Sequence, residues 1–99
     1  MIFDAHLDLS LNALEYNRDL RHCVDAIRAS EAGMSDLAGR AKNTVCFPEM
    51  RQAGIGVCVA TQIGGCMKPE GPVASWSSPE QAWAMTQGQL AWYLSLIHI

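Results

Sequence analysis

The sequence MIFDAHLDLSLN, residues 1–12, places three ionisable side chains at every second position between apolar residues. Strict alternation over residues 2–8 is typical of a β-strand, in which successive side chains point to opposite faces. The pattern therefore predicts a strand with Asp4, His6 and Asp8 on one face. Placing three such groups in a sheet costs free energy unless a partner compensates for their desolvation.

A metal ion is one partner that would do so. Side chains two residues apart on a strand have Cα atoms about 6.5 Å apart, so they can converge on one cation. A histidine nitrogen and an aspartate oxygen are ligands suited to Zn²⁺. His6 and Asp8 are thus candidate metal ligands at the carboxyl end of the strand, although a solvated polar strand face would give the same alternation.

A second informative stretch is TVCFPEMRQAGIGVCVATQI, residues 44–63. Pro48 suits the first position of a short helix, and Gly54 suits the position just after its end. The apolar run from Ile55 to Ile63 is rich in Val and Ile and is typical of a strand covered on both faces in a parallel sheet. We expect this strand to lie beside the first and parallel to it.

Two further helices are predicted. One spans residues 22–32 and ends near Gly33. The other begins with Ser78 as N-cap, Pro79 at the first position and Gln81 completing a capping box, and it continues to residue 94. Its apolar positions are expected to face the core; they are Trp83, Leu90 and Leu94, with Ala82, Met85 and Trp92 near them.

The remaining stretches are expected to be irregular. Gly64 and Gly65 predict a turn, and residues 68–80 a loop. The order strand, long connection, strand, helix indicates an α/β protein with parallel strands.

Composition excludes several classes of protein. A net charge of −3 with scattered basic residues argues against nucleic-acid binding. No apolar stretch approaches the roughly 20 residues that span a membrane, and no signal peptide is apparent. The four cysteines contain no CxxC pair, which favours buried free thiols and a cytoplasmic location. They are Cys23, Cys46, Cys58 and Cys66.

The last six residues, LSLIHI, have a different interpretation. One reverse translation of them matches the end of a transposon adapter used in preparing sequencing libraries. We therefore expect residues 94–99 to be a non-native tail, and His98 to have no functional role. Residues 1–93 would then be an N-terminal fragment of a longer domain.

FDAHLDLSLNAL near the N-terminus, followed some forty residues later by VCFPEMRQAGIGVCVATQI, resembles the start of the membrane dipeptidase (renal dipeptidase-like) family of zinc metallopeptidases. That family opens with a D-x-H-x-D strand and continues with a Pro-containing segment that leads into the second strand. The second stretch agrees with this segment at Val45, Phe47, Pro48, Met50, Arg51, Gly54 and Gly56. It departs from it at Cys46 and at Ala53.

The resemblance implies the N-terminal portion of a (β/α)₈ TIM barrel, incomplete in this chain. It implies a binuclear zinc site in the parent protein, with His6 and Asp8 as two ligands of one metal and Asp4 orienting the histidine. The parent would hydrolyse dipeptides with a metal-bridged hydroxide, and it could form a homodimer. The other ligands and the substrate-binding residues have no counterpart here, so no catalytic residue is assigned and the fragment alone is expected to be inactive.

Two alternatives remain open. One is a fragment of an amidohydrolase-type metal-dependent hydrolase, although such proteins usually carry HxH on the first strand. The other is a small non-enzymatic α/β module whose acidic strand face is only solvated.

Overall fold

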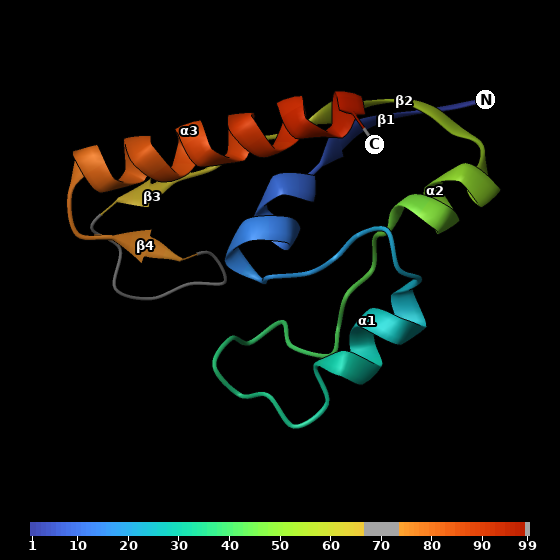
Figure 1. Ribbon diagram of the computed structural model, residues 1–99, viewed down its shortest axis with the longest axis horizontal. Coiled ribbons are helices and arrows are strands. Elements are labelled where there is room, and N and C mark those ends of the chain that lie inside the picture. Colours follow the sequence, from blue (N-terminus) through green and yellow to red (C-terminus); the bar gives the residue numbers. More distant parts are fainter. Residues whose placement is uncertain (67–73, 99) are drawn as a thin grey trace. The chain divides into compact units, whose positions relative to one another are not determined.

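The computed structural model describes residues 1–66 and 74–98 of a chain that divides into two compact units, Met1–Thr61 and Gln62–Ile99 (Figure 1). The first unit combines two strands with three short helices. In chain order these are β1 (Ile2–Leu7), the π-helix η1 (Leu11–Glu15), α1 (Val24–Ser30), α2 (Phe47–Ala53) and β2 (Ile55–Ala60).

Strands β1 and β2 pair in parallel, which confirms the prediction of adjacent parallel strands. The register aligns Asp4 with Cys58 and Leu7 with Ala60, so three steps along β1 match two along β2. This irregularity is a bulge, and it interrupts the alternation of side chains in β1. β2 ends at Ala60 rather than at Ile63, and Thr61 therefore lies immediately beyond it.

The connection from α2 to β2 follows the predicted chemistry. Pro48 lies in the first turn of α2, where its missing N–H costs nothing. Gly54 ends the helix with φ 78°, a left-handed conformation that glycine adopts without a Cβ penalty. Its N–H donates to the carbonyl of Arg51. The tight turn lets the chain enter β2 at the next residue.

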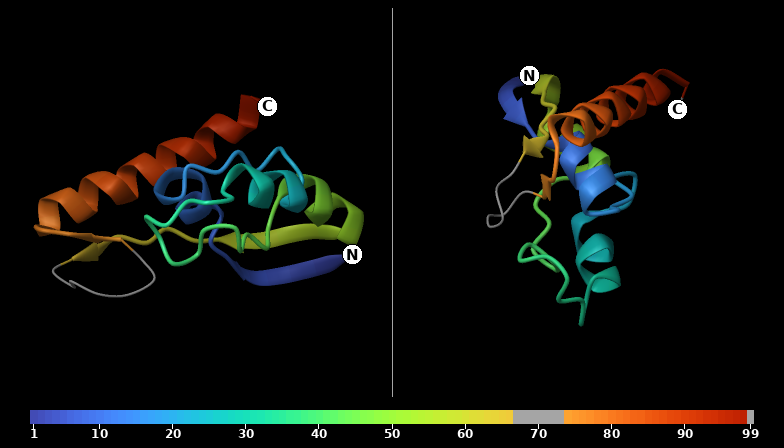
Figure 2. Two further views of the ribbon diagram at one scale, coloured as in Figure 1. Left: turned by 90° about the horizontal axis from the view of Figure 1, so that it is seen from below. Right: turned by 90° about the vertical axis from the view of Figure 1, so that its left-hand side faces the viewer.

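The core of this unit lies among the helices and connections rather than on both faces of the strands. Figure 2 shows η1, α1 and α2 on one side of the β1–β2 pair. Phe3, Val57 and Val59 are each about half exposed, so the expectation of a strand covered on both faces is wrong for β2. The buried apolar residues are Leu9, Ala13, Tyr16, Leu20, Val24, Ile27 and Cys46.

A buried ion network ties the connection between α1 and α2 to this core. The Glu31 carboxylate accepts two hydrogen bonds of 2.8 Å from Arg18, one of 2.9 Å from Arg40 and one of 2.9 Å from the Ala41 amide. The hydrogen bonds from Arg18 lower the pKa of Glu31 to about 2, against the opposing effect of burial. The Arg18 guanidinium also lies 4.2 Å from the centre of the Tyr16 ring, a cation–π contact.

The second unit packs a long helix against a minimal parallel strand pair. Its elements are β3 (Gly65–Cys66), β4 (Ser75–Trp76), α3 (Pro79–Ser95) and the 3₁₀-helix η2 (Leu96–His98). The Gln81 amide donates to the Ser78 hydroxyl over 3.2 Å, which confirms Ser78 as the N-cap. Strand β3 begins within the predicted Gly64–Gly65 turn. Of the predicted loop at 68–80, residues 68–73 lie outside the described residues.

The prediction that Trp83, Leu90 and Leu94 face a core is wrong, since all three are exposed. The buried positions of α3 are Ala82 and Gln89. This side of the helix approaches the chain closely at Gly64, where an added Cβ would meet the Ala82 carbonyl and the Thr86 hydroxyl, each at 2.8 Å. The small side chains of Ala82 and Thr86 permit this close approach of α3 to Gly64.

Gln89 is fully buried in a way that the sequence pattern did not indicate. Its side-chain amide accepts from the Ile63 N–H at 2.8 Å and donates to the Ile63 carbonyl at 2.6 Å. The helix thus supplies both hydrogen bonds that a neighbouring strand would supply at that residue.

The cysteines differ in environment, and none forms a disulfide. Cys46 is fully buried, as expected, and burial raises the pKa of its thiol. Cys58 and Cys66 are partly buried. Cys23 is exposed, because it precedes the first turn of α1, and the expectation of burial is wrong there.

Candidate functional site

The side chains of His6 and Asp8 lie in contact at the carboxyl end of β1. His6 Nε2 is 3.0 Å from Asp8 Oδ1. The two side chains are 71% and 43% exposed, respectively. The structure therefore brings together the two residues that the sequence pattern selected, on a surface open to solvent.

Thr61 joins this pair from the end of β2. Its backbone N–H donates to the Leu7 carbonyl over 3.1 Å, continuing the parallel ladder one residue past the strand. Its hydroxyl donates to Asp8 Oδ1, the same oxygen that contacts His6, and it also lies 3.3 Å from the Leu7 carbonyl oxygen. The sequence reasoning missed Thr61 because it placed this residue inside a strand running to Ile63.

The backbone of Asp8 is held from the other side by the residues that follow it. The Asn12 side-chain amide donates to the Asp8 carbonyl over 2.8 Å. The side-chain oxygen of Asn12 accepts a hydrogen bond of 2.6 Å from Arg18. The Ser10 hydroxyl donates to the Thr61 carbonyl over 2.9 Å. The end of β1 is thus connected both to the end of β2 and, through Asn12, to the buried ion network.

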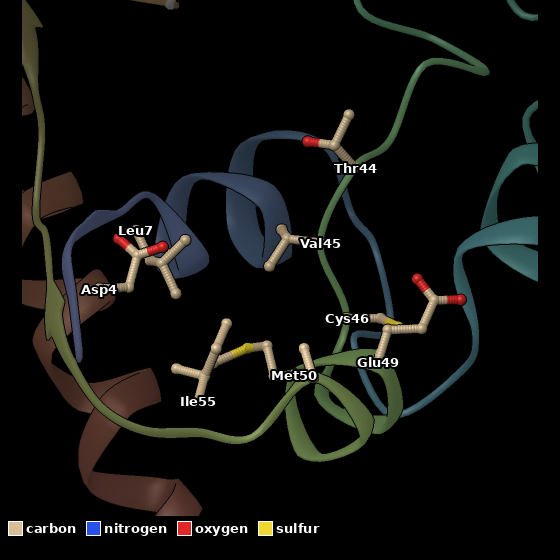
Figure 3. A pocket seen from close by; sticks show the side chains of 9 residues that line it. Asp4, Leu7, Thr44, Val45, Cys46, Glu49, Met50 and Ile55 are labelled. Atoms are coloured by element: carbon tan, nitrogen blue, oxygen red, sulfur yellow. The ribbon is translucent and has the colours of Figure 1, made fainter. Parts of the chain in front are cut away.

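Asp4 takes a different position from the one predicted. Its carboxylate accepts from the backbone amide of His6 at 2.9 Å. Figure 3 shows Asp4 and Leu7 turned toward the same pocket, which strict alternation would forbid. The bulge between these residues explains the change. The expected common face is therefore correct for His6 and Asp8 and wrong for Asp4.

That pocket lies wholly within the first unit and has a volume of about 310 Å³. Its lining is mostly apolar, and Val45, Met50 and Ile55 point into it (Figure 3). Glu49 lies at its rim, but its carboxylate turns toward α1 and accepts from the Val24 amide at 3.3 Å. Asp4 and Thr44 are the other residues of the lining with polar side chains.

The donor set at the end of β1 fits part of a zinc site. A histidine nitrogen and a carboxylate oxygen already converge, and both are open to solvent. Zinc normally takes three or four protein ligands. Within residues 1–66 and 74–98, no group of three or more His, Cys, Asp and Glu side chains could hold a metal. Among the described residues, His6 and Asp8 are thus two candidate ligands that lie together without a third beside them.

His22 lies apart from this site, in the connection that leads into α1, although the predicted helix over 22–32 included it. Its side chain is 63% exposed, and its Nε2 lies 3.6 Å from Asp19. Hydrogen bonds from Arg21 hold the pKa of the Asp19 carboxyl well below its ordinary value. This pairing gives His22 a local partner unrelated to β1.

In the described part of the chain, no helix has the length and apolar character that crossing a membrane requires. Comparisons with protein-family models, with curated proteins and with solved structures found no match to this chain.

Proposed function

We propose that this chain is the N-terminal part of a zinc-dependent dipeptidase built on a (β/α)₈ barrel, resembling the membrane dipeptidase family. The observation that carries the proposal is the contact between His6 and Asp8 at the carboxyl end of a strand paired in parallel. In such barrels the catalytic groups gather at this end of the strands. The parent would be cytoplasmic, act on dipeptides, and possess the remaining ligands in its later strands.

The roles of the chain's own residues follow from this geometry. His6 would offer Nε2 and Asp8 a carboxylate oxygen, and the 3.0 Å contact between them would open to admit the ion. Zinc, when bound, would supply Lewis acidity and an activated water for hydrolysis of the peptide bond. Asp4 would hold the backbone amide of His6, and so the direction of the strand at the ligand.

The test uses the longer open reading frame recovered downstream of codon 93. In its protein product, His6→Ala and Asp8→Ala should each abolish hydrolysis of a simple dipeptide and lower zinc content measured by elemental analysis. His22→Ala is the matched control, because it removes an exposed imidazole away from the site, and it should change neither quantity.

Normal turnover and zinc content in His6→Ala would reject the proposal. The exposed histidine would then belong to a solvated strand face, as in the non-enzymatic alternative. Activity of the longer product on cyclic amides, but not on dipeptides, would favour the amidohydrolase alternative.

A further inference from the structure

We propose that Thr61 is the positioning residue for Asp8: its hydroxyl holds the carboxylate beside His6 so that both side chains face one cation. The inference rests on the proposed function for the identity of that cation. The positioning itself rests on contacts between the ends of β1 and β2.

The backbone places Thr61 with little freedom. Its N–H donates to the Leu7 carbonyl over 3.1 Å, and its own carbonyl accepts from the Ser10 hydroxyl over 2.9 Å. Leu7 and Ser10 flank Asp8 in the chain, so Thr61 is anchored on both sides of the residue that its hydroxyl contacts. Thr61 itself is partly buried.

Asp8, by contrast, has a side chain that is 43% exposed. An exposed aspartate side chain exchanges among staggered rotamers unless a contact selects one. The hydroxyl of Thr61 and Nε2 of His6 both approach Oδ1. Together they fix the carboxylate plane, and they leave the other oxygen free of any hydrogen bond recorded among the described residues.

Outer partners of this kind orient metal-ligating carboxylates, and their loss typically weakens metal affinity about 10- to 100-fold. Thr61 differs from the contacts at the Asp8 backbone because its hydroxyl reaches the carboxylate itself, from just beyond the end of β2. Its hydroxyl can therefore be removed with the strand pairing left in place.

The experiment compares Thr61→Val, which is isosteric but lacks the hydroxyl, with Thr61→Ser, which retains it. Thr44→Val removes a hydroxyl from an exposed threonine outside the His6–Asp8 contact and serves as the control. In the purified chain, three-bond NMR couplings report the χ1 rotamer of Asp8 without metal. A titration with Co²⁺, followed by the His6 imidazole resonances, reports the affinity for a cation.

We expect one Asp8 rotamer in the wild type, in Thr61→Ser and in Thr44→Val, and averaged couplings in Thr61→Val. The dissociation constant for Co²⁺ should rise about tenfold in Thr61→Val and be restored in Thr61→Ser. A hydroxyl with a merely structural role would change stability but would not produce this rescue of the rotamer and the affinity.

An unchanged Asp8 rotamer in Thr61→Val overturns the inference, whatever the metal does. If the rotamer averages as expected but Co²⁺ leaves the His6 resonances of the wild type unchanged, the positioning role stands, and His6 and Asp8 do not hold a cation without the later strands of the proposed parent. Thr61→Ala provides a second hydroxyl-free variant. If it and Thr61→Val both lose the native amide spectrum, Thr61 is a structural residue and the inference is overturned.

Discussion

At the scale of single residues, Glu31 is the buried carboxylate on which the ion network of the first unit converges. It is 3% exposed, and both of its oxygens are occupied by arginine side chains and a backbone amide. Removing its charge leaves Arg18 and Arg40 with poorer partners in a buried site. Because a hydrogen bond to a charged group contributes roughly 1.5–3 kcal/mol, we predict that Glu31→Gln lowers the free energy of unfolding by about 2 kcal/mol.

The stability that Glu31 contributes decreases as the pH falls. The pKa of Glu31 falls from its ordinary value of 4.5 to about 2 in the folded chain. The unfolded state therefore binds a proton at Glu31 more tightly than the folded state does. The contribution of ionised Glu31 to the free energy of unfolding is fully present above pH 4.5 and is lost as the pH falls toward 2. Urea unfolding at pH 6, 4 and 3 should show this loss in the wild type and much less of it in Glu31→Gln.

Asp36→Asn is the matched control, since it removes another carboxylate that contacts Arg40 but lies on the surface. It should destabilise far less than Glu31→Gln. Equal effects of the two substitutions would show that burial of the Glu31 contacts does not contribute.

At the scale of elements, the turn from α2 into β2 depends on one left-handed residue. An added Cβ at Gly54 would meet nothing within 4 Å, so the cost of a side chain there is conformational and not steric crowding. The left-handed region costs L-residues about 1–2 kcal/mol. We predict that Gly54→Ala lowers the free energy of unfolding by about 1 kcal/mol, measured by urea titration.

Gly54→Asn should cost less than Gly54→Ala, because asparagine tolerates this conformation better. A larger cost for Asn than for Ala would contradict the conformational explanation and point to a contact made by the longer side chain.

These elements also show which features the sequence could predict. Helix ends can be predicted at Pro48, Gly54 and Ser78, because each of these residues affects only the backbone next to it in the sequence. The alternation in residues 2–8 likewise predicted β1, and the apolar run that begins at Ile55 predicted its parallel partner. The contact between His6 and Asp8 followed from their spacing of two.

The features that escaped prediction depend on partners distant in the chain. Gln89 is buried where its side-chain amide bonds the backbone N–H and carbonyl of Ile63. Glu31 is buried where Arg18 and Arg40 both donate to its carboxylate. The bulge that turns Asp4 into the pocket arises from the pairing with β2. No local pattern encodes such contacts. Zinc, the barrel and the dipeptide substrate remain predictions that depend on the resemblance.

At the scale of the whole chain, the β1–β2 pair carries exposed apolar side chains. Phe3 pairs with Val57, and Val57 and Val59 are each about half exposed. Exposed apolar strands with unpaired edges promote association between chains. We predict that the double substitution Val57→Thr and Val59→Thr reduces self-association, measured by sedimentation velocity across a concentration series.

Threonine retains the β-branched shape and the strand propensity, so β2 should persist in this variant. Met34→Thr is the control, because it also makes an exposed apolar side chain polar, but in a connection away from the strands. If Met34→Thr reduced association as much as the double variant, the strands would not be the adhesive surface.

The Glu31 network has a further consequence for susceptibility to proteases. Arg40 lies in the connection after α1, a segment of the kind that proteases cut first. Its guanidinium, however, is bound to Glu31, Asp36 and the Tyr16 carbonyl, and its side chain is only 10% exposed. An arginine-specific protease must insert this side chain into its own pocket, so cleavage after Arg40 requires the network to open first. The contacts of the Arg40 side chain thereby protect the peptide bond after Arg40 from cleavage.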